Sequence, residues 1–388
     1  MAKIEGIFEM ARRITQPVSV GDVVVGGNAP ISVQSMTKTD TRDIKATVNQ
    51  IKQLEEAGCE IVRCAVPDLE SAVALKSIKT QSTIPVIADI HFHHELALES
   101  LRSGVDCLRL NPGNIRDKGK VKLIVKEAKE RQVPIRIGVN FGSLPPVDGI
   151  GKTGGVSRHT DGVNLLEKGS SVKGNYSVVD HMIATGLWEI GILESLDFDL
   201  IKISLKAFDI ETTVASYRGM AELVPYPLHL GITEAGTAES GSIRSAIGLG
   251  ILLYEGIGDT IRVSLSDEPV KEVDTGFEIL KAMELRKESP ILVACPSCGR
   301  ADVDVRKLAN EVDDLLKKIK TPIKVAVMGC EVNGPGEAKD ADVGIAAGSG
   351  RAVIFRKGKK SKIVDEKDML KTLMDEIYKV ERELADPN

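Results

Sequence analysis

Aromatic residues, long apolar runs and a strong net charge are all scarce or absent in this sequence of 388 residues. Phe, Trp and Tyr together make up 3% of the chain, so base stacking is disfavoured as a mode of binding. The formal net charge of -5 argues against a nucleic-acid or anionic-membrane surface. No stretch of eighteen apolar residues occurs and the N-terminus has no apolar signal-peptide core, so we expect a cytoplasmic protein without a membrane segment.

Cysteine is present six times, and in a reducing compartment these residues are expected to be thiols or metal ligands instead of disulfides. Cys59, Cys64 and Cys107 lie in or beside β-rich stretches, where we predict buried, inert thiols. The other three cysteines lie near the C-terminus in a different pattern.

Short apolar, β-branched runs alternate with amphipathic helical patterns over about 250 residues, which predicts parallel β-α crossover units. The eight runs are ISVQSM (31–36), EIVRCAV (60–66), IPVIADI (84–90), VDCLRL (105–110), VPIRIGV (133–139), DLIKISL (199–205), YPLHLGI (226–232) and DTIRVSL (259–265). Eight repeats favour a (β/α)8 TIM-type barrel over the alternative, an open doubly wound sheet, because no G-x-G-x-x-G follows a strand.

The barrel is expected to span residues 1–286, followed by a small α+β domain over 287–388. A polar stretch at 142–174 interrupts the repeat and is interpreted as a long loop over one barrel face. Its GKT lacks the glycine, strand and helix of a phosphate-binding loop, so that motif is rejected. The basic segment FRKGKKSK (355–362) is interpreted as a solvated hairpin tip.

Charged residues occur inside the predicted strands, where helices cover the outside, so their side chains must point into the barrel or its mouth. The basic residues are Arg63, Arg109, Arg136, Lys202 and Arg262, and the acidic ones at or after strand ends are Asp89 and Glu234. The alternative to a binding site is a buried network of ion pairs. The cations outnumber the acids, however, and arginine forks hold phosphate oxygens bidentately, so we predict a diphosphate site at the barrel mouth.

Three further features surround this mouth. Glu234 is a candidate acid or base, and Asp89 is a candidate for orienting a hydroxyl group. The turn LNPGN (110–114) is expected to direct backbone N–H groups at the same ligand. The histidines of HFHH (91–94) do not fall on one helix face, so we expect His93 and His94 to face solvent or cap a helix rather than bind metal.

Cys295 and Cys298 form a C-x2-C pair, and Cys330 follows in the glycine-rich segment MGCEVNGPGE. Zinc would require a fourth Cys or His, but the last histidine is His229, in the barrel repeat. A thioredoxin-like dithiol would leave Cys330 without a role. An iron–sulfur cluster accounts for all three thiols, with Glu337 as the proposed fourth, more easily displaced ligand. The spacing favours the cluster over zinc without excluding zinc.

The ordered motifs APISVQSMT, ADIHF, LRLNPGNI, IRIGVN, HLGITEAG, IGDTIRVSLS, CPSCGR and MGCEVNGPGE resemble a known family over essentially the full length. It is the family of bacterial 4-hydroxy-3-methylbut-2-en-1-yl diphosphate synthases, iron–sulfur enzymes of the methylerythritol phosphate route to isoprenoids. HFHHEL and GVNFGSL depart from the family's usual residues after HF and after GVN, which affects only the detailed contacts.

The resemblance implies an oxidoreductase that converts 2-C-methyl-D-erythritol 2,4-cyclodiphosphate to 4-hydroxy-3-methylbut-2-enyl diphosphate, with electrons from flavodoxin or ferredoxin. It implies a homodimer in which the cluster domain of one subunit caps the barrel of the other. The implied ligands of a [4Fe-4S] cluster are Cys295, Cys298, Cys330 and Glu337. The implied substrate-binding residues are Arg63, Arg109, Arg136, Asn140, Lys202, Arg262 and Asn333, and Glu234 is the implied acid near the reacting carbons.

Overall fold

The computed structural model describes residues 11–115, 117–147, 150, 157–160, 177–286, 289–299, 301, 303–330, 336, 339–348 and 350–385. The chain divides into two compact units, Met1–Met283 and Glu284–Asn388, which are described separately below. Among the described residues, no helix has both the length and the apolar character needed to cross a membrane.

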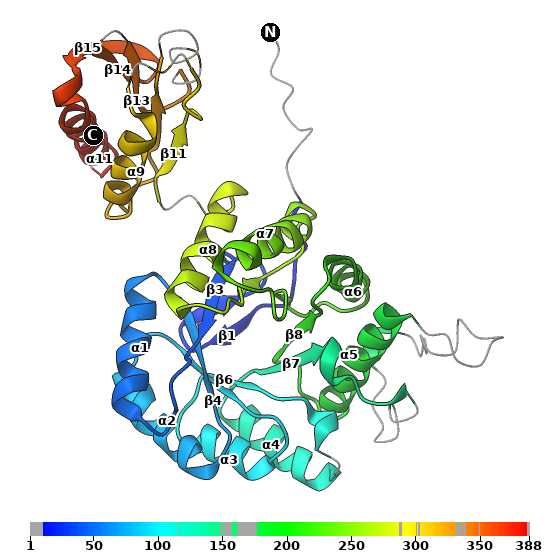
Figure 1. Ribbon diagram of the computed structural model, residues 1–388. Coiled ribbons are helices and arrows are strands. Elements are labelled where there is room, and N and C mark those ends of the chain that lie inside the picture. Colours follow the sequence, from blue (N-terminus) through cyan, green and yellow to red (C-terminus); the bar gives the residue numbers. More distant parts are fainter. Residues whose placement is uncertain are drawn as a thin grey trace. The chain divides into compact units, whose positions relative to one another are not determined.

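Eight parallel strands form the barrel of the first unit (Figure 1). They are β3 Ser32–Met36, β4 Ile61–Ala65, β5 Val86–Asp89, β6 Cys107–Arg109, β7 Ile135–Asn140, β8 Ile201–Lys206, β9 His229–Leu230 and β10 Thr260–Ile261. Strand β10 pairs with both β3 and β9, and a bridge between Ile203 and Leu228 joins β8 to β9. The ring therefore closes, which confirms the predicted barrel, and the open sheet is excluded.

A helix follows each barrel strand and covers its outer face (Figure 1). These helices are α1 Ile44–Glu56, α2 Leu69–Gln81, α3 His94–Arg102, α4 Lys118–Glu130, α5 Val178–Glu194, α6 Ile210–Leu223, α7 Ala238–Tyr254 and α8 Pro269–Ala282. Several begin at the residue types that satisfy free amides at a helix start. Asp43, Asp68 and Asp209, for example, each accept a hydrogen bond from the backbone N–H three residues later.

A hairpin that the sequence analysis missed closes the N-terminal end of the barrel. Strands β1 (Val18–Val20) and β2 (Val23–Val25) pair antiparallel, and their valines pack on Ile61, Ile87 and Cys107 from the barrel strands. This apolar floor leaves the carboxyl ends of the strands as the open end, where barrel enzymes hold their sites.

The three barrel cysteines are buried free thiols, as predicted. Burial raises the pKa of Cys59 to about 12 and that of Cys64 to about 11, so neither is a thiolate at neutral pH.

The second unit is a mixed five-stranded sheet in the order β11-β12-β13-β14-β15, with two long helices. Its elements are β11 Ile291–Ala294, α9 Val305–Leu316, β12 Lys324–Met328, β13 Val343–Gly348, β14 Arg351–Arg356, β15 Lys359–Asp365 and α11 Met369–Ala385. Lys357 and Gly358 form the tip of the β14–β15 hairpin, as predicted for the basic segment.

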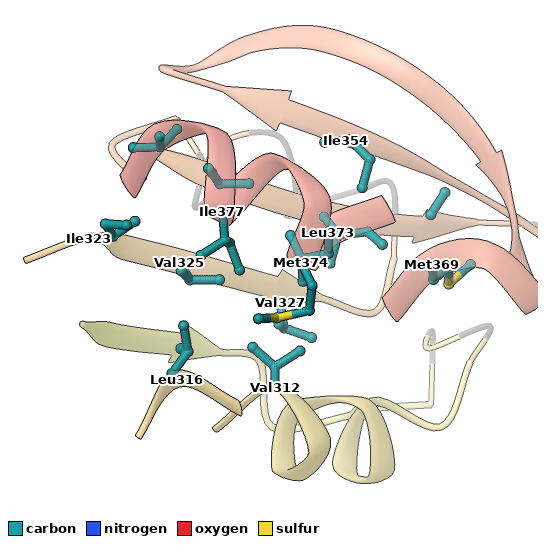
Figure 2. Packing of buried hydrophobic residues seen from close by; sticks show 14 of the residues in the cluster. Val312, Leu316, Ile323, Val325, Val327, Ile354, Met369, Leu373, Met374 and Ile377 are labelled. Carbon is teal, nitrogen blue, oxygen red and sulfur yellow. The ribbon is translucent and has the colours of Figure 1, made fainter. Parts of the chain in front are cut away.

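A separate apolar core holds this unit together (Figure 2). Val325 and Val327 of β12 meet Val312 of α9, while Leu373 and Ile377 of α11 pack over the same sheet. Because this core is made only of residues from the second unit, the unit has the apolar interior that an independent domain needs.

Candidate active site

The basic residues predicted from the strands do lie inside the barrel. Arg109 and Arg136 are 5% and 2% exposed, and Lys202 is completely buried. Arg63 lies in β4 and Arg262 directly follows β10, and their side chains keep 14% and 16% exposure. Five strands therefore direct cationic side chains into one interior.

Asp89, at the end of β5, is the carboxylate at the centre of this cluster. Its Oδ1 lies 3.5 Å from Nη1 of Arg109, and its Oδ2 lies 3.9 Å from Nε of Arg63. Burial would raise the pKa of Asp89, but the charges of these two arginines and a hydrogen bond with His91 outweigh burial and lower the pKa below its usual range. Asp89 is therefore ionised and acts as a counter-charge and hydrogen-bond acceptor.

Two lysines of β8 lie in the same interior. The amino group of Lys202 has no hydrogen-bond partner among the described residues, and burial lowers its pKa to about 8. Cys107, which packs against the β1–β2 hairpin, and Asp259 both influence the pKa of Lys202. The amino group of Lys202 therefore lies deep in the barrel. Lys206, which the sequence analysis missed, lies with its Nζ 3.4 Å from Nε2 of His229. Alternation in a strand puts residues 202, 204 and 206 on one face, so the signal for Lys206 was present.

Glu272 on α8 is a second acidic partner that the sequence pattern did not reveal. Its Oε2 lies 3.2 Å from Nη2 of Arg262 and accepts a hydrogen bond from the hydroxyl of Ser35 at 3.0 Å. Its Oε1 accepts the amide N–H of Leu265 at 3.1 Å and lies 3.5 Å from Nζ of Lys38. Glu272 thus fixes Arg262 and connects the ends of β3 and β10.

The interior remains positively charged after this pairing. Burial together with the charges of Arg136 and Arg262 lowers the pKa of Lys206 well below its ordinary value. Lys206 is therefore readily deprotonated in this interior. Even without it, four arginines and Lys202 face Asp89 and Glu272. Among the described residues, Nε of all four arginines also lacks a hydrogen-bond partner. The cluster therefore has unmet charge and donor capacity for an anion, and the alternative of a fully paired network does not account for it.

Glycines make the space for these long side chains. A Cβ atom at Gly138 of β7 would lie 2.6 Å from Nε of Arg109, and one at Gly231 would collide with Nζ of Lys206. Either position would force the adjacent cation to move if it carried a side chain.

Glu234 and Asn140 lie at the mouth. Asn140 is the last residue of β7 and is partly buried. Glu234 is exposed just after β9 and has φ of +53°, a left-handed conformation that non-glycine residues seldom adopt. Such strain persists only where the surroundings impose it, and it often marks functional positions.

The three histidines of HFHH lie in different surroundings. His91 joins the mouth, with Nδ1 3.1 Å from Nη1 of Arg109. His93 is exposed at the start of α3 and makes no side-chain capping bond, so it faces solvent as expected, while His94 lies 2.7 Å from Glu95.

The expectation that the LNPGN turn directs its amides at the ligand is wrong for Leu110, Gly113 and Asn114. The N–H of Leu110 donates to the carbonyl of Arg136 at 3.1 Å. The N–H of Gly113 donates to Oε2 of Glu189 on α5 at 2.6 Å. The N–H groups of Asn114 and Ile115 donate to the carbonyls of Asn111 and Pro112, each at 3.0 Å. These amides of the turn, which contains the 3-10 helix η1 Pro112–Asn114, therefore bond within the protein.

In the second unit, adjacent parallel strands bring two of the three C-terminal cysteines to the same sheet end. Cys295 follows β11 and Cys330 comes two residues after β12, and Ala294 pairs with Val327. The amide of Gly329 donates to Sγ of Cys295 at 3.3 Å, and Cys298 lies exposed three residues after Cys295. Asn333 and Glu337 lie outside the described residues, so their predicted roles are not tested.

The pattern of these cysteines fits an iron–sulfur cluster, because such clusters take cysteine thiolates contributed by separate turns. The amide N–H that Gly329 donates to Sγ of Cys295 is a contact of the kind that tunes a ligating sulfur. An open hollow of about 500 Å³, lined partly by Cys295, Pro296 and Ser297, leaves space beside the first thiol.

Replacing Gly138 tests the arrangement of the anion site. In Gly138→Ala the new methyl group would displace the guanidinium of Arg109, and we expect inorganic diphosphate to bind about tenfold more weakly because one charged hydrogen-bonding group is lost. Isothermal titration calorimetry measures this affinity. Gly142→Ala, where a Cβ would meet nothing within 4 Å, is the matched control. Equal affinities of the two variants would contradict the assignment of Arg109 to the anion site.

Comparison with known proteins gives two family matches. The model described as the GcpE TIM-barrel domain matches residues 15–277, and the GcpE protein C-terminal domain matches residues 291–379. Solved structures of dihydropteroate synthases also resemble the chain, for example that from Stenotrophomonas maltophilia, with a TM-score of 0.45 and 13% identity over 66% of this chain and 93% of that one.

Curated relatives match over nearly their whole length and share one name, "4-hydroxy-3-methylbut-2-en-1-yl diphosphate synthase (flavodoxin)". The protein from Dehalococcoides mccartyi is 53% identical over 368 residues, which is 95% of this chain and 99% of that one. The Geobacter sulfurreducens protein is 53% identical over 366 residues, with 94% and 98% covered. The family resemblance seen in the sequence is thereby confirmed, and this chain belongs to the GcpE family, with both its barrel and its C-terminal domain.

Proposed function

We propose that the chain catalyses the reaction for which its relatives are named, the synthesis of 4-hydroxy-3-methylbut-2-en-1-yl diphosphate. The substrate is 2-C-methyl-D-erythritol 2,4-cyclodiphosphate. The observation that carries this proposal is the unneutralised cationic interior at the barrel mouth, which suits a diphosphate held through the whole reaction.

The overall change is a reductive ring opening with loss of water. A carbon–oxygen bond of the cyclic diphosphate breaks, the C3 hydroxyl group leaves as water, and an alkene forms. The balance consumes two electrons and two protons for each substrate molecule. A [4Fe-4S] cluster, when bound, supplies the electrons one at a time. The side chains of the protein bind and orient the substrate and protonate its departing hydroxyl group.

Arg63, Arg109, Arg136 and Arg262 are proposed to hold the two phosphates, with Asn140 at the rim. Lys206 adds a donor beside them, and Lys202 contributes positive charge from deeper in the barrel. The phosphate released by ring opening gains negative charge, and a preorganised cationic site stabilises that charge as it develops. The same contacts keep the carbon skeleton in place between the two electron transfers.

Glu234 is proposed to donate the proton that converts the departing hydroxyl group to water. Its exposed position at the mouth and its left-handed backbone support this assignment. Asp89 is proposed to orient a substrate hydroxyl group, because it is ionised and held by two arginines.

Cys295, Cys298, Cys330 and Glu337 are proposed to hold the cluster. The three cysteines carry thiols that form no disulfide with one another, and the ends of β11 and β12 bring two of them to one edge. A carboxylate is a harder ligand than a thiolate and is exchanged more readily at iron, so Glu337 marks the position where substrate can approach. Asn333, in the segment between Cys330 and Glu337, is proposed to face the substrate.

We infer a cytoplasmic homodimer in which the cluster domain of one subunit caps the barrel of its partner. An exposed apolar stripe on α7 supports association of two copies, because Ile243, Ile247 and Tyr254 are 58%, 49% and 57% exposed. The electron donor is proposed to be flavodoxin, following the names of the relatives, with ferredoxin as the alternative carrier.

Anaerobic reconstitution of the purified protein with iron and sulfide tests the proposal directly. Broad visible absorption from a bound cluster, together with reduction of the cyclodiphosphate by a flavodoxin reducing system, is the expected result. A colourless protein with one zinc, or a metal-free protein with a reactive Cys295 thiol, would contradict it.

Cys330→Ala should abolish cluster binding and turnover together, because two thiolates and one carboxylate do not retain the cluster. Iron and sulfide analysis with the visible spectrum measures the loss. Cys59→Ala, at a buried barrel thiol, should keep both the cluster and the activity. A fully coloured, active Cys330→Ala protein would remove Cys330 from the ligand set.

Arg136→Ala should keep the visible spectrum and raise KM by about 10- to 100-fold, because a charge-assisted hydrogen bond contributes about 1.5–3 kcal/mol. Steady-state kinetics with the reconstituted enzyme measures the change. Arg131→Ala, at an exposed arginine paired with Glu127, is the control. An unchanged KM in Arg136→Ala would refute the diphosphate site.

Glu337→Ala should retain part of the cluster in a form that oxygen destroys faster than in the wild type, because one iron loses its protein ligand. The decay of visible absorbance in air measures this loss. Undiminished turnover combined with wild-type oxygen stability would show that another group completes the site.

A further inference from the structure

Glu189 is a buried carboxyl group for which the reaction above provides no role. It lies on α5 in the barrel wall, is 1% exposed, and its Oε2 accepts the N–H of Gly113 at 2.6 Å. A buried carboxyl group is costly unless its interactions compensate, so its contacts define what it does.

The contact at Gly113 is closely fitted. A Cβ atom at Gly113 would lie 2.6 Å from Oε1 of Glu189 and 2.5 Å from the ring of Trp188. The side chains of Glu189 and Trp188 therefore leave room only for a glycine at the centre of the η1 turn.

The same turn is connected to the anion site by hydrogen bonds. Asn111 donates from Nδ2 to the carbonyl of Gly138 at 3.0 Å, and its Oδ1 accepts the N–H of Gly138 at 2.8 Å. That carbonyl also accepts Nη2 of Arg109 at 3.1 Å. Displacement of the turn would therefore move the acceptor that orients the guanidinium of Arg109.

We propose that Glu189 is a positioning residue for the diphosphate site, which holds the Gly113 amide and thereby fixes the Asn111–Asn114 turn and the guanidinium of Arg109. This inference rests on the proposed function, because the ligand that Arg109 receives is the diphosphate. Glu189 touches neither the substrate nor the cluster and acts only through these neighbours.

The charge state of Glu189 provides a readout that a purely structural residue would lack. Burial raises its pKa to about 8, and the Gly113 hydrogen bond and the charge of Arg109 lower it only partly. η1 contributes the amide N–H of Gly113, and β6 contributes Arg109, the charged side chain that acts on the titration of Glu189. Above pH 8 the new negative charge attracts Arg109 and weakens the positive field at the mouth, so diphosphate binding should fall.

The experiment is calorimetric titration of the full-length, cluster-reconstituted protein with inorganic diphosphate at pH 7 and pH 9. Glu189→Ala should bind about tenfold more weakly than wild type at pH 7, because the turn loses its buried acceptor. The affinity of Glu189→Gln for diphosphate should lie within about twofold of that of the wild type, because the amide oxygen of glutamine accepts the same hydrogen bond. The affinity of Glu189→Gln for diphosphate should also fall less between pH 7 and pH 9 than that of the wild type. Glu222→Ala, at an exposed position of α6, is the matched control and should behave as wild type.

Two further measurements separate positioning from general destabilisation. Trp188 is the only tryptophan in the chain and packs on Gly113, so its fluorescence should change in Glu189→Ala and not in Glu222→Ala. In turnover, the KM of Glu189→Ala should rise about tenfold with kcat changing less, because the reacting groups are intact.

Stability gives an independent check with a defined sign. The folded pKa of Glu189 is raised from 4.5 to about 8, so the folded state keeps a proton that the unfolded state has lost over this interval. The contribution of Glu189 to the stability of the wild type therefore decreases as pH rises from about 5 to about 8, and Glu189→Gln lacks this contribution. The melting temperature of Glu189→Gln should exceed that of the wild type at pH 9. Equal melting temperatures at this pH would contradict the raised pKa of the buried Glu189 carboxyl group.

Wild-type affinity in a folded Glu189→Ala protein would overturn the positioning role. If Glu189→Ala does not fold, parallel pH dependences of wild type and Glu189→Gln would overturn it, since Lys202 and the diphosphate titrate equally in both. A wild-type protein that binds no diphosphate would instead remove the proposed function, and this inference with it.

Discussion

The excess of positive charge inside the barrel is the constraint on which the rest of the first unit depends. An unpaired buried charge costs several kcal/mol, and here four arginines and two lysines share an interior with few carboxylates. Burial lowers the pKa of Arg136 to about 9 and that of Lys202 to about 8, so both side chains stay mainly protonated at pH 7. The apolar floor, the helical wall and the acids Asp89 and Glu272 offset the cost of this interior. A polyanion that enters the mouth relieves the repulsion among these cations. Part of the free energy of anion binding therefore comes from this relief of repulsion.

Steric space is the second requirement, because long cationic side chains must fit where other barrels pack aliphatic ones. Gly138 and Gly231 supply that space at Arg109 and Lys206, and Gly113 lets the turn after β6 approach α5. Electrostatics and packing are thus coupled through backbone positions that carry no charge. A substitution of one of these glycines acts on anion binding through geometry, even though none of them has a functional group.

The sequence was sufficient for the barrel, its strand positions and most of the cationic residues, because a charged residue in a strand covered by helices can point only into the barrel or its mouth. The same alternation should have identified Lys206, two positions after Ser204. The β1–β2 hairpin was missed because its strands are three residues long, although Gly21, with φ of +60°, marks its turn. Glu272 could not be found from sequence, since a glutamate in an amphipathic helix is ordinary until tertiary contacts bury it. The amides of the LNPGN turn were misassigned for the same reason, as their partners come from β7, from within the turn and from α5. Glu189 did leave a signal that was overlooked, because it is a charged residue inside the nearly all-apolar stretch 182–193 of α5. Predictions on Asn333 and Glu337 remain predictions.

The division into two cores separates two chemistries that would disturb one another in a single interior. Cluster thiolates placed among these cations would act as counter-charges to them, unlike the buried, protonated thiols of Cys59 and Cys64, and would neutralise the proposed diphosphate site. In the second unit the cysteines instead lie at one end of a small sheet, where Cys298 and its neighbours Pro296 and Ser297 are exposed or partly exposed. Exposure suits electron entry from a carrier protein, but it would leave a reduced cluster open to water and oxygen. A covering surface is therefore required during turnover, and in the proposed homodimer the partner's cationic barrel mouth with bound substrate would supply both the cover and the electron acceptor. This is why we favour capping by a second copy of the chain over a cluster domain that acts alone.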